Sequence, residues 1–276
     1  MEKYLDPEKF VPFYESDTAL LYRTDAFVAL ENIREQCADL IFADPPYFLS
    51  NGGITCKNGR MVSVNKGMWD ACTDYQQKYE FNRRWLSLCK RVLKPEGTIW
   101  ISGTLHNIYV IGALLEELGY RIINNIIWQK KNPPPNLACK CFTHSTETIL
   151  WAKLDNGEPY YFNYQLMKKL NENKQMKDVW SGSLTPQREK MFGKHPTQKP
   201  LYLLERIVDA ASREGDVILD PFAGSSSTGV AAISKGRRFI GFDLEEPFLK
   251  LSAKRLQQAE ISVKHKPVNA EKSSKK

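Results

Sequence analysis

Short runs of Ile, Val, Leu and Phe recur along this chain of 276 residues, and helical patterns separate most of them. Runs of this length and composition are typical of strands that are buried on both faces of a sheet. Strands that alternate with helices predict an α/β fold with a doubly wound, mostly parallel sheet. The runs are DLIFA (39–43), GTIWIS (97–102), IINNIIW (122–128), TETILWA (146–152), DVILD (216–220) and RRFIGF (237–242).

Three of the intervening segments have the pattern of amphipathic helices. Residues 81–93, FNRRWLSLCKRVL, place apolar side chains on one helical face and stop before KPEG (94–97), because proline cannot continue a helix. The segment NIYVIGALLEELGY ends near Gly119, which suits the left-handed position after a helix. The segment PLYLLERIVDAASREG begins with Pro200, which we expect at the first helical position.

The length of the chain suits one large domain, which we expect to span residues 1–263. Residues 48–75 are rich in Gly, Asn, Ser and Lys and predict a long functional or mobile loop. Residues 153–194 are polar and basic with interleaved aromatic residues. They fit either a recognition insert or a solvent-exposed excursion with a small core of its own. Residues 264–276 lack apolar periodicity and predict a disordered basic tail.

Positive charge is concentrated in the middle of the chain. Residues 129–200 contain twelve Lys or Arg and six Asp or Glu, and the whole chain has a net charge of +7. A basic segment with interleaved aromatic side chains favours contact with the phosphates of a nucleic acid. The alternative at this point is a solvated lysine-rich face.

The sequence disfavours several other classes of protein. The N-terminus is charged, and no apolar run reaches 18 residues, so we expect a cytoplasmic protein without membrane contact. The six cysteines form no CxxC pair. Cys139 and Cys141 with His144 could suggest a metal, but zinc prefers four ligands at other spacings. We therefore expect reduced thiols and no metal.

The segment 217–244, VILDPFAGSSSTGVAAISKGRRFIGFDL, has the pattern of a strand, a turn of small residues, a helix, a second strand and an acid. Small residues let a ligand approach the backbone closely. Asp243 follows Asp220 by 23 residues, where nucleotide-binding βαβ units place an acid on the ribose. Because the sequence has neither GxGxxG nor a P-loop motif, a nucleoside without phosphates, such as S-adenosylmethionine, fits better than a dinucleotide. An ordinary α/β turn is the alternative.

The run DLIFA stops at Asp44-Pro45-Pro46-Tyr47, because two prolines end any strand ladder. The Asp44 carboxylate and the Pro45 carbonyl can accept hydrogen bonds from an exocyclic amino group of a nucleobase. Two such acceptors would draw the nitrogen lone pair out of conjugation, and the prolines would aim the carbonyl in advance. Tyr47 would give a stacking face to a base rotated out of the helix. The alternative is a simple strand-end turn.

Three motifs together resemble those of the amino-group DNA methyltransferases: DPPY (44–47), HPTQKP (195–200) and DPFAGSSST (220–228). Their order is that of the circularly permuted β-class. Longer strings resemble the second adenine methyltransferase of DpnII-type GATC restriction–modification systems, over roughly residues 18–258. These strings are DPPYFLSNGGI, WISGTLHNIY, FTHSTETILWA, KQMKDVW and GKHPTQKP.

The resemblance implies a Rossmann-like fold, methyl transfer from S-adenosylmethionine to adenine N6, GATC as the target, and activity on single- and double-stranded DNA. It also implies a functional partnership with a restriction endonuclease and a second methyltransferase. The sequence leaves the oligomeric state open, with a homodimer as one alternative. By the family pattern, Asp44, Pro45, Pro46 and Tyr47 form the catalytic motif, and target recognition falls in residues 153–194.

The resemblance further implies that Lys199 helps to hold the methionine end of the cofactor. The full set of implied cofactor residues is Asp25, Asp44, Lys199, Asp220, Phe222, Gly224, Ser225, Ser226, Ser227, Thr228 and Asp243. From their basic or aromatic character, the residues that we expect to contact DNA are Trp69, Lys130, Lys131, Lys168, Lys169, Lys174, Trp180, Arg188 and Lys190.

Ser226 departs from the family pattern FxGxG, in which a second glycine stands here. If its φ angle is positive, strain of about 1 kcal/mol is expected. Cytosine N4 is the nearest rival target, although Asp before PPY favours adenine. A DNA-binding module that has lost catalysis is a further alternative. Cytosine C5 chemistry is excluded because no Pro-Cys pair occurs, and a glutamine methyltransferase is disfavoured by the basic insert and the permuted order.

Overall fold

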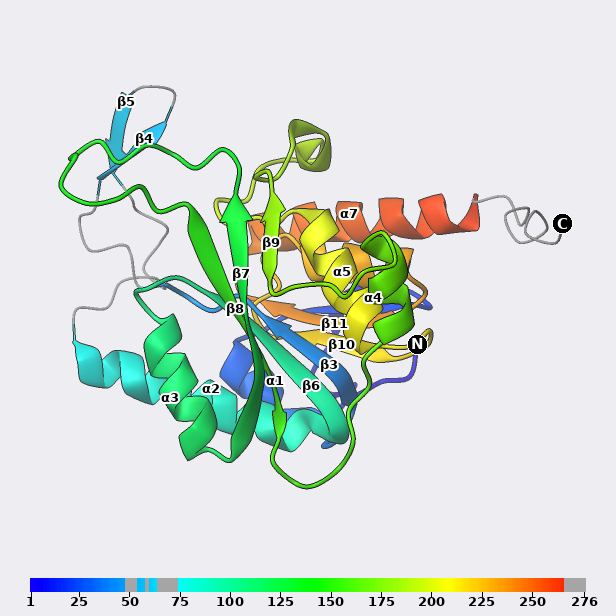
Figure 1. The fold of residues 1–276 in the computed structure, drawn as a ribbon. Coiled ribbons are helices and arrows are strands. Elements are labelled where there is room, and N and C mark those ends of the chain that lie inside the picture. The colour runs from blue at the N-terminus through cyan, green and yellow to red at the C-terminus, as the bar shows by residue number, and fades with distance from the viewer. Residues whose placement is uncertain (48–53, 58–59, 64–73, 266–276) are drawn as a thin grey trace, which may run out of the picture.

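A nine-stranded sheet forms the centre of the computed structural model, which describes residues 1–47, 54–57, 60–63 and 74–265. Its strand order is β1-β2-β11-β10-β3-β6-β8-β7-β9 (Figure 1). The bounds are β1 (Pro12–Glu15), β2 (Ala19–Arg23), β3 (Ala38–Ala43), β6 (Leu93–Gly103), β7 (Tyr120–Lys130), β8 (Thr146–Leu154), β9 (Val179–Gly182), β10 (Val217–Asp220) and β11 (Arg238–Asp243). A separate hairpin pairs β4 (Ile54–Lys57) with β5 (Arg60–Ser63). Trp69, most of the predicted loop 48–75 and the tail from residue 266 lie outside the described residues.

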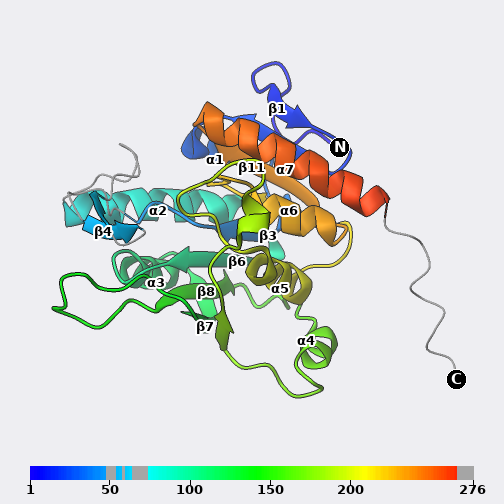
Figure 2. The ribbon, with the colours of Figure 1, turned by 90° about the horizontal axis from the view of Figure 1, so that it is seen from above.

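Helices cover both faces of the sheet (Figures 1 and 2). One layer packs α1 (Ala26–Asn32), α2 (Tyr75–Val92) and α3 (Ile108–Glu117) on one apolar core. The other packs α5 (Leu201–Ala211), α6 (Ser227–Ser234) and α7 (Glu246–Lys264) on a second core, with α4 (Tyr164–Leu170) beside α5. The arrangement confirms the predicted doubly wound α/β fold. No helix in the described part of the chain is long and apolar enough to cross a membrane.

The sheet is mostly parallel, as predicted, because five of its eight neighbouring strand pairs run in the same direction. The exceptions are β1 at one edge and β8, which runs antiparallel to both β6 and β7. All six predicted strands are present. The strands β1, β2 and β9 were not predicted, and neither were β4 and β5, which lie within the predicted loop 48–75. The edge strands β1 and β9 mix polar with apolar residues and lack the continuous apolar run that marked the six predicted strands.

The helix boundaries follow the predicted stop signals. α2 ends at Val92, one residue earlier than predicted, and Leu93 and the KPEG segment already belong to β6. Gly119 adopts the expected left-handed conformation with φ 77° after α3. The prediction for Pro200 was wrong by one position. Its ψ angle of 141° is extended, so Pro200 is the N-cap residue of α5 and Leu201 is the first helical residue.

Part of the basic segment 153–194 is built into the sheet instead of standing apart from it. β9 pairs in parallel with β7 and forms an edge strand. Trp180 on β9 is only 6% exposed, lies 6.4 Å from the ring of Trp100, and carries the guanidinium of Arg206 4.9 Å above its ring. The expectation that Trp180 contacts DNA was therefore wrong, because its indole is a core side chain.

We expect Trp180→Ala to lower the free energy of unfolding by about 3–5 kcal/mol, because it removes a large buried ring and leaves a cavity. Denaturant unfolding measures this change. Phe142→Ala is the matched control, since Phe142 is 96% exposed and its truncation should change stability by less than about 0.5 kcal/mol. A Trp180→Ala protein of normal stability and impaired DNA affinity would contradict the core assignment.

Candidate active site

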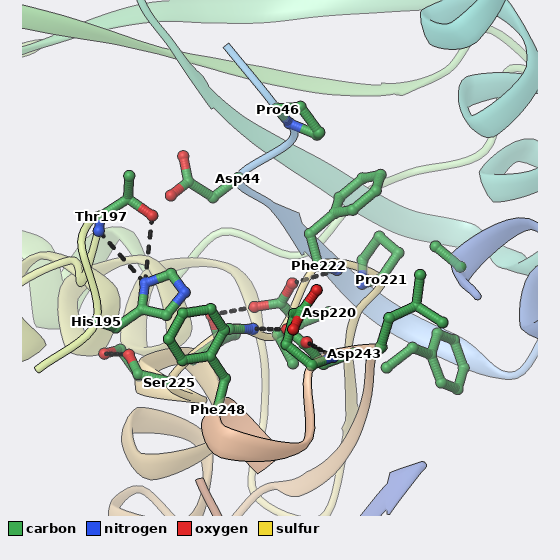
Figure 3. A pocket seen from close by; sticks show the side chains of 18 of the residues that line it. Asp44, Pro46, His195, Thr197, Asp220, Pro221, Phe222, Ser225, Asp243 and Phe248 are labelled. Atoms are coloured by element: carbon green, nitrogen blue, oxygen red, sulfur yellow. Dashed lines mark hydrogen bonds between the residues drawn. The ribbon is translucent and has the colours of Figure 1, made fainter. Parts of the chain in front are cut away.

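A cavity of about 280 Å³ lies where β3, β10 and β11 end. These strands are parallel, so their carboxyl ends meet at one edge of the sheet, which is where ligands bind in open α/β folds. Figure 3 shows the acids Asp44, Asp220 and Asp243 around this space, each at or directly after the end of one of the three strands.

The turn between β10 and α6 is organised by Asp220. Its carboxylate accepts hydrogen bonds from the Phe222 backbone N–H at 3.0 Å and from the Thr228 hydroxyl at 2.7 Å. Burial raises the pKa of Asp220 to about 7, although these two hydrogen bonds act in the opposite direction. The carboxylate therefore fixes the start of α6 below the cavity.

Asp243 holds the same turn from the tip of β11. Its two oxygens accept hydrogen bonds from the Gly224 N–H at 2.9 Å and the Glu245 N–H at 2.8 Å. Burial raises the pKa of Asp243 to about 6. Gly224 is required here for two reasons. Its φ angle is 51°, and a Cβ would lie 3.0 Å from the ring of His195.

Aromatic side chains line one side of the cavity. Phe27 meets Phe81 edge to face at 5.2 Å, and Phe222 meets Trp85 in the same way at 5.6 Å. On the opposite side His195 contacts Phe248 with ring centroids 4.2 Å apart. Of these six residues we predicted only Phe222. His195 opens the HPTQKP motif, but the motif gave this residue no role of its own. The other four lie on α1, α2 and α7 with the spacing of core residues, so no pattern in the sequence singled them out.

Ser226 has the positive φ angle for which the sequence predicted backbone strain. Its φ angle is 50°, in the left-handed region, and its backbone N–H is bonded to the Ala223 carbonyl at 2.6 Å. Its hydroxyl is buried and has no hydrogen-bond partner among the described residues. The positive φ meets the condition for strain, and Ser226 does not itself line the cavity.

Asp44 follows β3, and both of its carboxylate oxygens are engaged. The Tyr47 hydroxyl donates to Oδ1 at 2.5 Å, and the Lys199 ammonium donates to Oδ2 at 2.5 Å. The Tyr47 hydroxyl also lies 3.1 Å from the Ser102 hydroxyl, and the Asn107 amide donates to the Pro46 carbonyl at 3.4 Å. Asp44 and Pro46 line the cavity, so the structure holds a carboxylate in a fixed position at its mouth.

The position of Tyr47 differs from the expected stacking face. Its ring is only 6% exposed, and its hydroxyl lies within hydrogen-bond distance of Asp44, Ser102 and Lys199. Tyr47 thus orients the carboxylate of its own motif in this structure. A stacking role for its ring stays a prediction.

Lys199 is buried beside Asp44 and also lines the cavity. Burial alone would lower the pKa of its ammonium, but Asp44, Tyr47 and Glu147 outweigh burial and raise that pKa well above its ordinary value. Lys199 therefore carries a positive charge against the carboxylate that we predicted to be catalytic. Its predicted contact with the methionine end of the cofactor stays a prediction.

The other residues predicted to bind the cofactor converge on the same cavity. It is lined by Asp25, Asp44, Lys199, Asp220, Phe222, Gly224, Ser225, Ser227, Thr228 and Asp243. Asp25 is also the N-cap of α1 and accepts hydrogen bonds from Phe27 and Val28.

The residues predicted to contact DNA do not form one cluster. Strands β7 and β9 end at the same edge of the sheet as the cavity. Lys131 directly follows β7. The 3-10 helix η2 (Gln187–Lys190), which carries Arg188 and Lys190, comes after β9. Lys168 and Lys169 lie on α4. The backbone N–H of Asn163, the N-cap of α4, donates to the Ala210 carbonyl near the C-terminal end of α5, which lies away from the cavity.

Two further predicted DNA contacts are already paired within the chain. Lys130 is only 13% exposed and forms an ion pair with Glu147 at 2.7 Å, so its ammonium is not a free surface charge. Lys174 is exposed and lies 3.8 Å from Glu172. In the described part of the chain, no group of three or more His, Cys, Asp or Glu residues could hold a metal ion.

The cavity fits a nucleoside cofactor that carries no phosphate. Asp243 offers a carboxylate at the tip of a strand, where ribose hydroxyls bind, and the Phe27, Phe81 and Phe222 rings offer an apolar surface for a base. Its acids would repel phosphates, and its lining lysine is held by Asp44. The fold and the cavity together define an S-adenosylmethionine-dependent methyltransferase.

The sequence comparisons identify the class of methyltransferase. The chain matches the N6/N4 DNA methylase family over residues 38–254. It is 59% identical over 247 residues to the type II methyltransferase M2.DpnII of Streptococcus pneumoniae, covering 89% of this chain and 92% of that protein. It is 58% identical over 248 residues to the type II methyltransferase M2.LlaDCHI of Lactococcus lactis subsp. cremoris, and the match covers 90% of this chain and 92% of that protein. The chain therefore belongs to the N6/N4 DNA methylase family and is a type II DNA methyltransferase.

Solved structures agree with this assignment. The complex of M1.HpyAVI with S-adenosylmethionine superimposes with a TM-score of 0.64 at 26% identity, covering 86% of this chain and 98% of that one. The cytosine-N4-specific PvuII DNA methyltransferase gives a TM-score of 0.71 at 17% identity, covering 91% and 94%. The second similarity concerns the fold alone.

We expect Ser226→Gly to raise the free energy of unfolding by up to about 1 kcal/mol. The change relieves the left-handed strain and removes a buried hydroxyl without a partner, and the greater freedom of unfolded glycine offsets part of the gain. Denaturant unfolding measures it. Ser225→Gly is the control, since Ser225 has no positive φ and should lose stability. A loss of stability in Ser226→Gly would show that the strain is negligible.

We expect cofactor affinity to fall as the pH is lowered through about 6. Asp243 is ionised above its pKa of about 6, and only the carboxylate can accept hydrogen bonds from both ribose hydroxyls. Asp220, with a pKa of about 7, titrates in the same range, so the comparison needs Asp243→Asn. Titrations of S-adenosylmethionine at pH 5 to 8 should show weaker binding and a flatter pH profile for this variant. An unchanged profile would assign the titration to Asp220.

Proposed function

We propose that the protein is a site-specific adenine-N6 DNA methyltransferase that modifies GATC within a restriction–modification system. The observation that carries the proposal is the Asp44 carboxylate, held at the mouth of the cofactor cavity by Tyr47 and Lys199. The choice of GATC as the target sequence rests on the family membership and on the motifs that resemble the DpnII type. In this proposal, Asp44, Pro45, Pro46 and Tyr47 act on the base.

Asp44 and the Pro45 carbonyl orient the target amino group by accepting its two hydrogens. This arrangement pulls the nitrogen lone pair out of the ring and aims it into the cavity. S-adenosylmethionine, when bound, supplies a methyl group made electrophilic by its sulfonium. After transfer the nitrogen must lose a proton, and the nearest base is the Asp44 carboxylate. The buried Asn107–Pro46 contact keeps the two prolines in place during this step.

The cofactor is held by the residues around the β10–α6 turn. Asp243 binds the ribose hydroxyls, the aromatic side chains Phe27, Phe81 and Phe222 bind the adenine ring, and Asp25 lies at the edge of the same cavity. The Asp220 carboxylate keeps the turn in shape through Phe222 and Thr228.

Cytosine N4 is the second candidate target, since the amine chemistry is the same. The fold similarity to the PvuII enzyme does not favour it, because 17% identity shows only a shared fold. Adenine is favoured by Asp44 before PPY and by the motifs that resemble the DpnII type. The 59% identity to the type II methyltransferase M2.DpnII supports that resemblance. Activity on single-stranded as well as double-stranded DNA belongs to the same proposal.

Recognition of DNA is assigned to the edge of the sheet that carries the cavity. Lys131, Arg188 and Lys190 follow strands that end there, and their cationic side chains suit phosphate contacts. A restriction endonuclease and a second methyltransferase are the proposed functional partners in the cytoplasm, and a homodimer is one form in which the protein could act.

The decisive experiment uses labelled S-adenosylmethionine with single- and double-stranded oligonucleotides, with and without GATC. Digestion to nucleosides identifies the methylated base. We expect N6-methyladenine, confined to GATC and formed in both strand states. N4-methylcytosine would replace the proposed target by the second candidate, and transfer outside GATC would contradict the proposed specificity.

We expect Asp44→Ala to lower the transfer rate at least about 100-fold, because it removes an acceptor that acts in the transition state. DNA affinity, measured by fluorescence anisotropy, should stay within about threefold. Asp39→Asn is the matched control at the other end of β3, where Asp39 pairs with Lys94 at 2.7 Å. It should keep normal turnover. Near-normal turnover in Asp44→Ala would contradict the mechanism.

A further inference from the structure

Four largely buried charges of alternating sign lie in a row that ends at Asp44 of the proposed catalytic motif. Lys130 lies 2.7 Å from Glu147 Oε1, Glu147 Oε2 lies 3.6 Å from the Lys199 ammonium, and Lys199 lies 2.5 Å from Asp44. Their side chains are only 6–13% exposed. They come from β7, β8, the segment before α5 and the end of β3, so the folded sheet brings together residues that are far apart in the sequence.

The row places the Lys199 ammonium at the Asp44 carboxylate, where a positive charge disfavours the proposed methyl transfer. Asp44 Oδ2 is occupied by the Lys199 ammonium and Oδ1 by the Tyr47 hydroxyl. A target amino group needs an acceptor there, and its nitrogen becomes positive as it is methylated. An ammonium held against the same carboxylate competes for that acceptor and repels the developing charge.

Glu147 offers the ammonium a second position. Its Oε2 atom is buried and has no hydrogen-bond partner in the described part of the chain, while its Oε1 is bound by Lys130. The gap of 3.6 Å to Lys199 needs to close by less than about 1 Å to form a charge-assisted hydrogen bond. A small rotation of a flexible lysine side chain provides that movement.

Both partners are charged in the folded protein. Burial would raise the pKa of Glu147, but the ammonium groups of Lys199 and Lys130 outweigh burial and hold that pKa below its ordinary value. Lys130 also fixes the orientation of the carboxylate, because it binds one oxygen and leaves the other facing Lys199.

We propose that Glu147 is a positioning residue that takes the Lys199 ammonium from Asp44 when the target amino group arrives. Before the base enters, Lys199 compensates the buried Asp44. Once the base is bound, Glu147 compensates Lys199, and Asp44 is free to accept from the amino group. The proposal rests on the proposed role of Asp44 as an acceptor. It adds a residue that acts on catalysis through Lys199 without touching the base.

The test is a double-mutant cycle between Glu147→Gln and Lys199→Met, read as single-turnover rates at saturating DNA and S-adenosylmethionine. We expect Glu147→Gln to lower the single-turnover rate at least about tenfold, while the dissociation constants for DNA and for S-adenosylmethionine stay within about threefold of normal. In the Lys199→Met background, the same substitution should change the rate by less than about threefold, because its effect passes through the lysine.

Glu147→Asp is the second variant, since it keeps the negative charge between Lys130 and Lys199, and we therefore expect it to fold even if Glu147→Gln does not. A residue that only neutralises two lysines would tolerate aspartate. A positioning carboxylate would not, because its reach shortens by one methylene group, so we expect a rate at least about threefold below normal with unchanged affinities. This variant decides the matter if Lys199→Met has no measurable rate.

Asp209→Asn is the matched control for loss of a buried ion-paired acid. Asp209 binds Lys235 at 2.6 Å near the ends of α5 and α6 that lie away from the cavity, so its loss should affect stability and leave the single-turnover rate unchanged. The proposal is overturned if Glu147→Gln and Glu147→Asp turn over normally, if only affinities change, or if the losses multiply in the double variant. Normal turnover by Asp44→Ala would instead overturn the proposed function.

Discussion

The parallel register of β3, β10 and β11 is the constraint on which the active site depends. Because Leu219 pairs with both Ile41 and Ile240, the three strands end together and bring Asp44, Asp220 and Asp243 to one edge of the sheet. Three acids so close in a poorly solvated space would be unstable without compensation. Each is therefore held by donors that the local fold supplies, and these bonds give the cavity its shape.

The way in which the three acids are compensated separates their roles. Asp220 and Asp243 are stabilised by neutral donors, mainly backbone N–H groups of the turn that they shape, and burial raises the pKa of each. Asp44 is paired with a full positive charge. A neutral donor network suits a permanent structural and ribose-binding role, whereas a movable counter-ion suits a carboxylate that must change partners during a reaction.

The sequence predicted the parts of this site that depend on neighbours along the chain. The strand runs, the diproline and the 23-residue spacing of Asp220 and Asp243 are local patterns, and all of them converge as expected. The failures were long-range. Trp180 had the composition of a DNA-contacting aromatic, but an unpredicted edge strand carries it into the core. Glu147 and Lys130 belong to different strands, and only the antiparallel pairing of β7 and β8 makes them partners.

The contact between Gly224 and His195 has a thermodynamic consequence. At Gly224, where a Cβ would lie 3.0 Å from the His195 ring, the cofactor turn meets the HPTQKP segment, and that segment carries Lys199. A ligand that moved this turn would therefore press on the segment that carries Lys199. Such coupling is reciprocal: if the cofactor changes the affinity for DNA by some factor, DNA must change the affinity for the cofactor by the same factor. Any linkage between cofactor and DNA binding that runs through this contact between the Gly224 backbone and the His195 ring would make each substrate a heterotropic effector of the other.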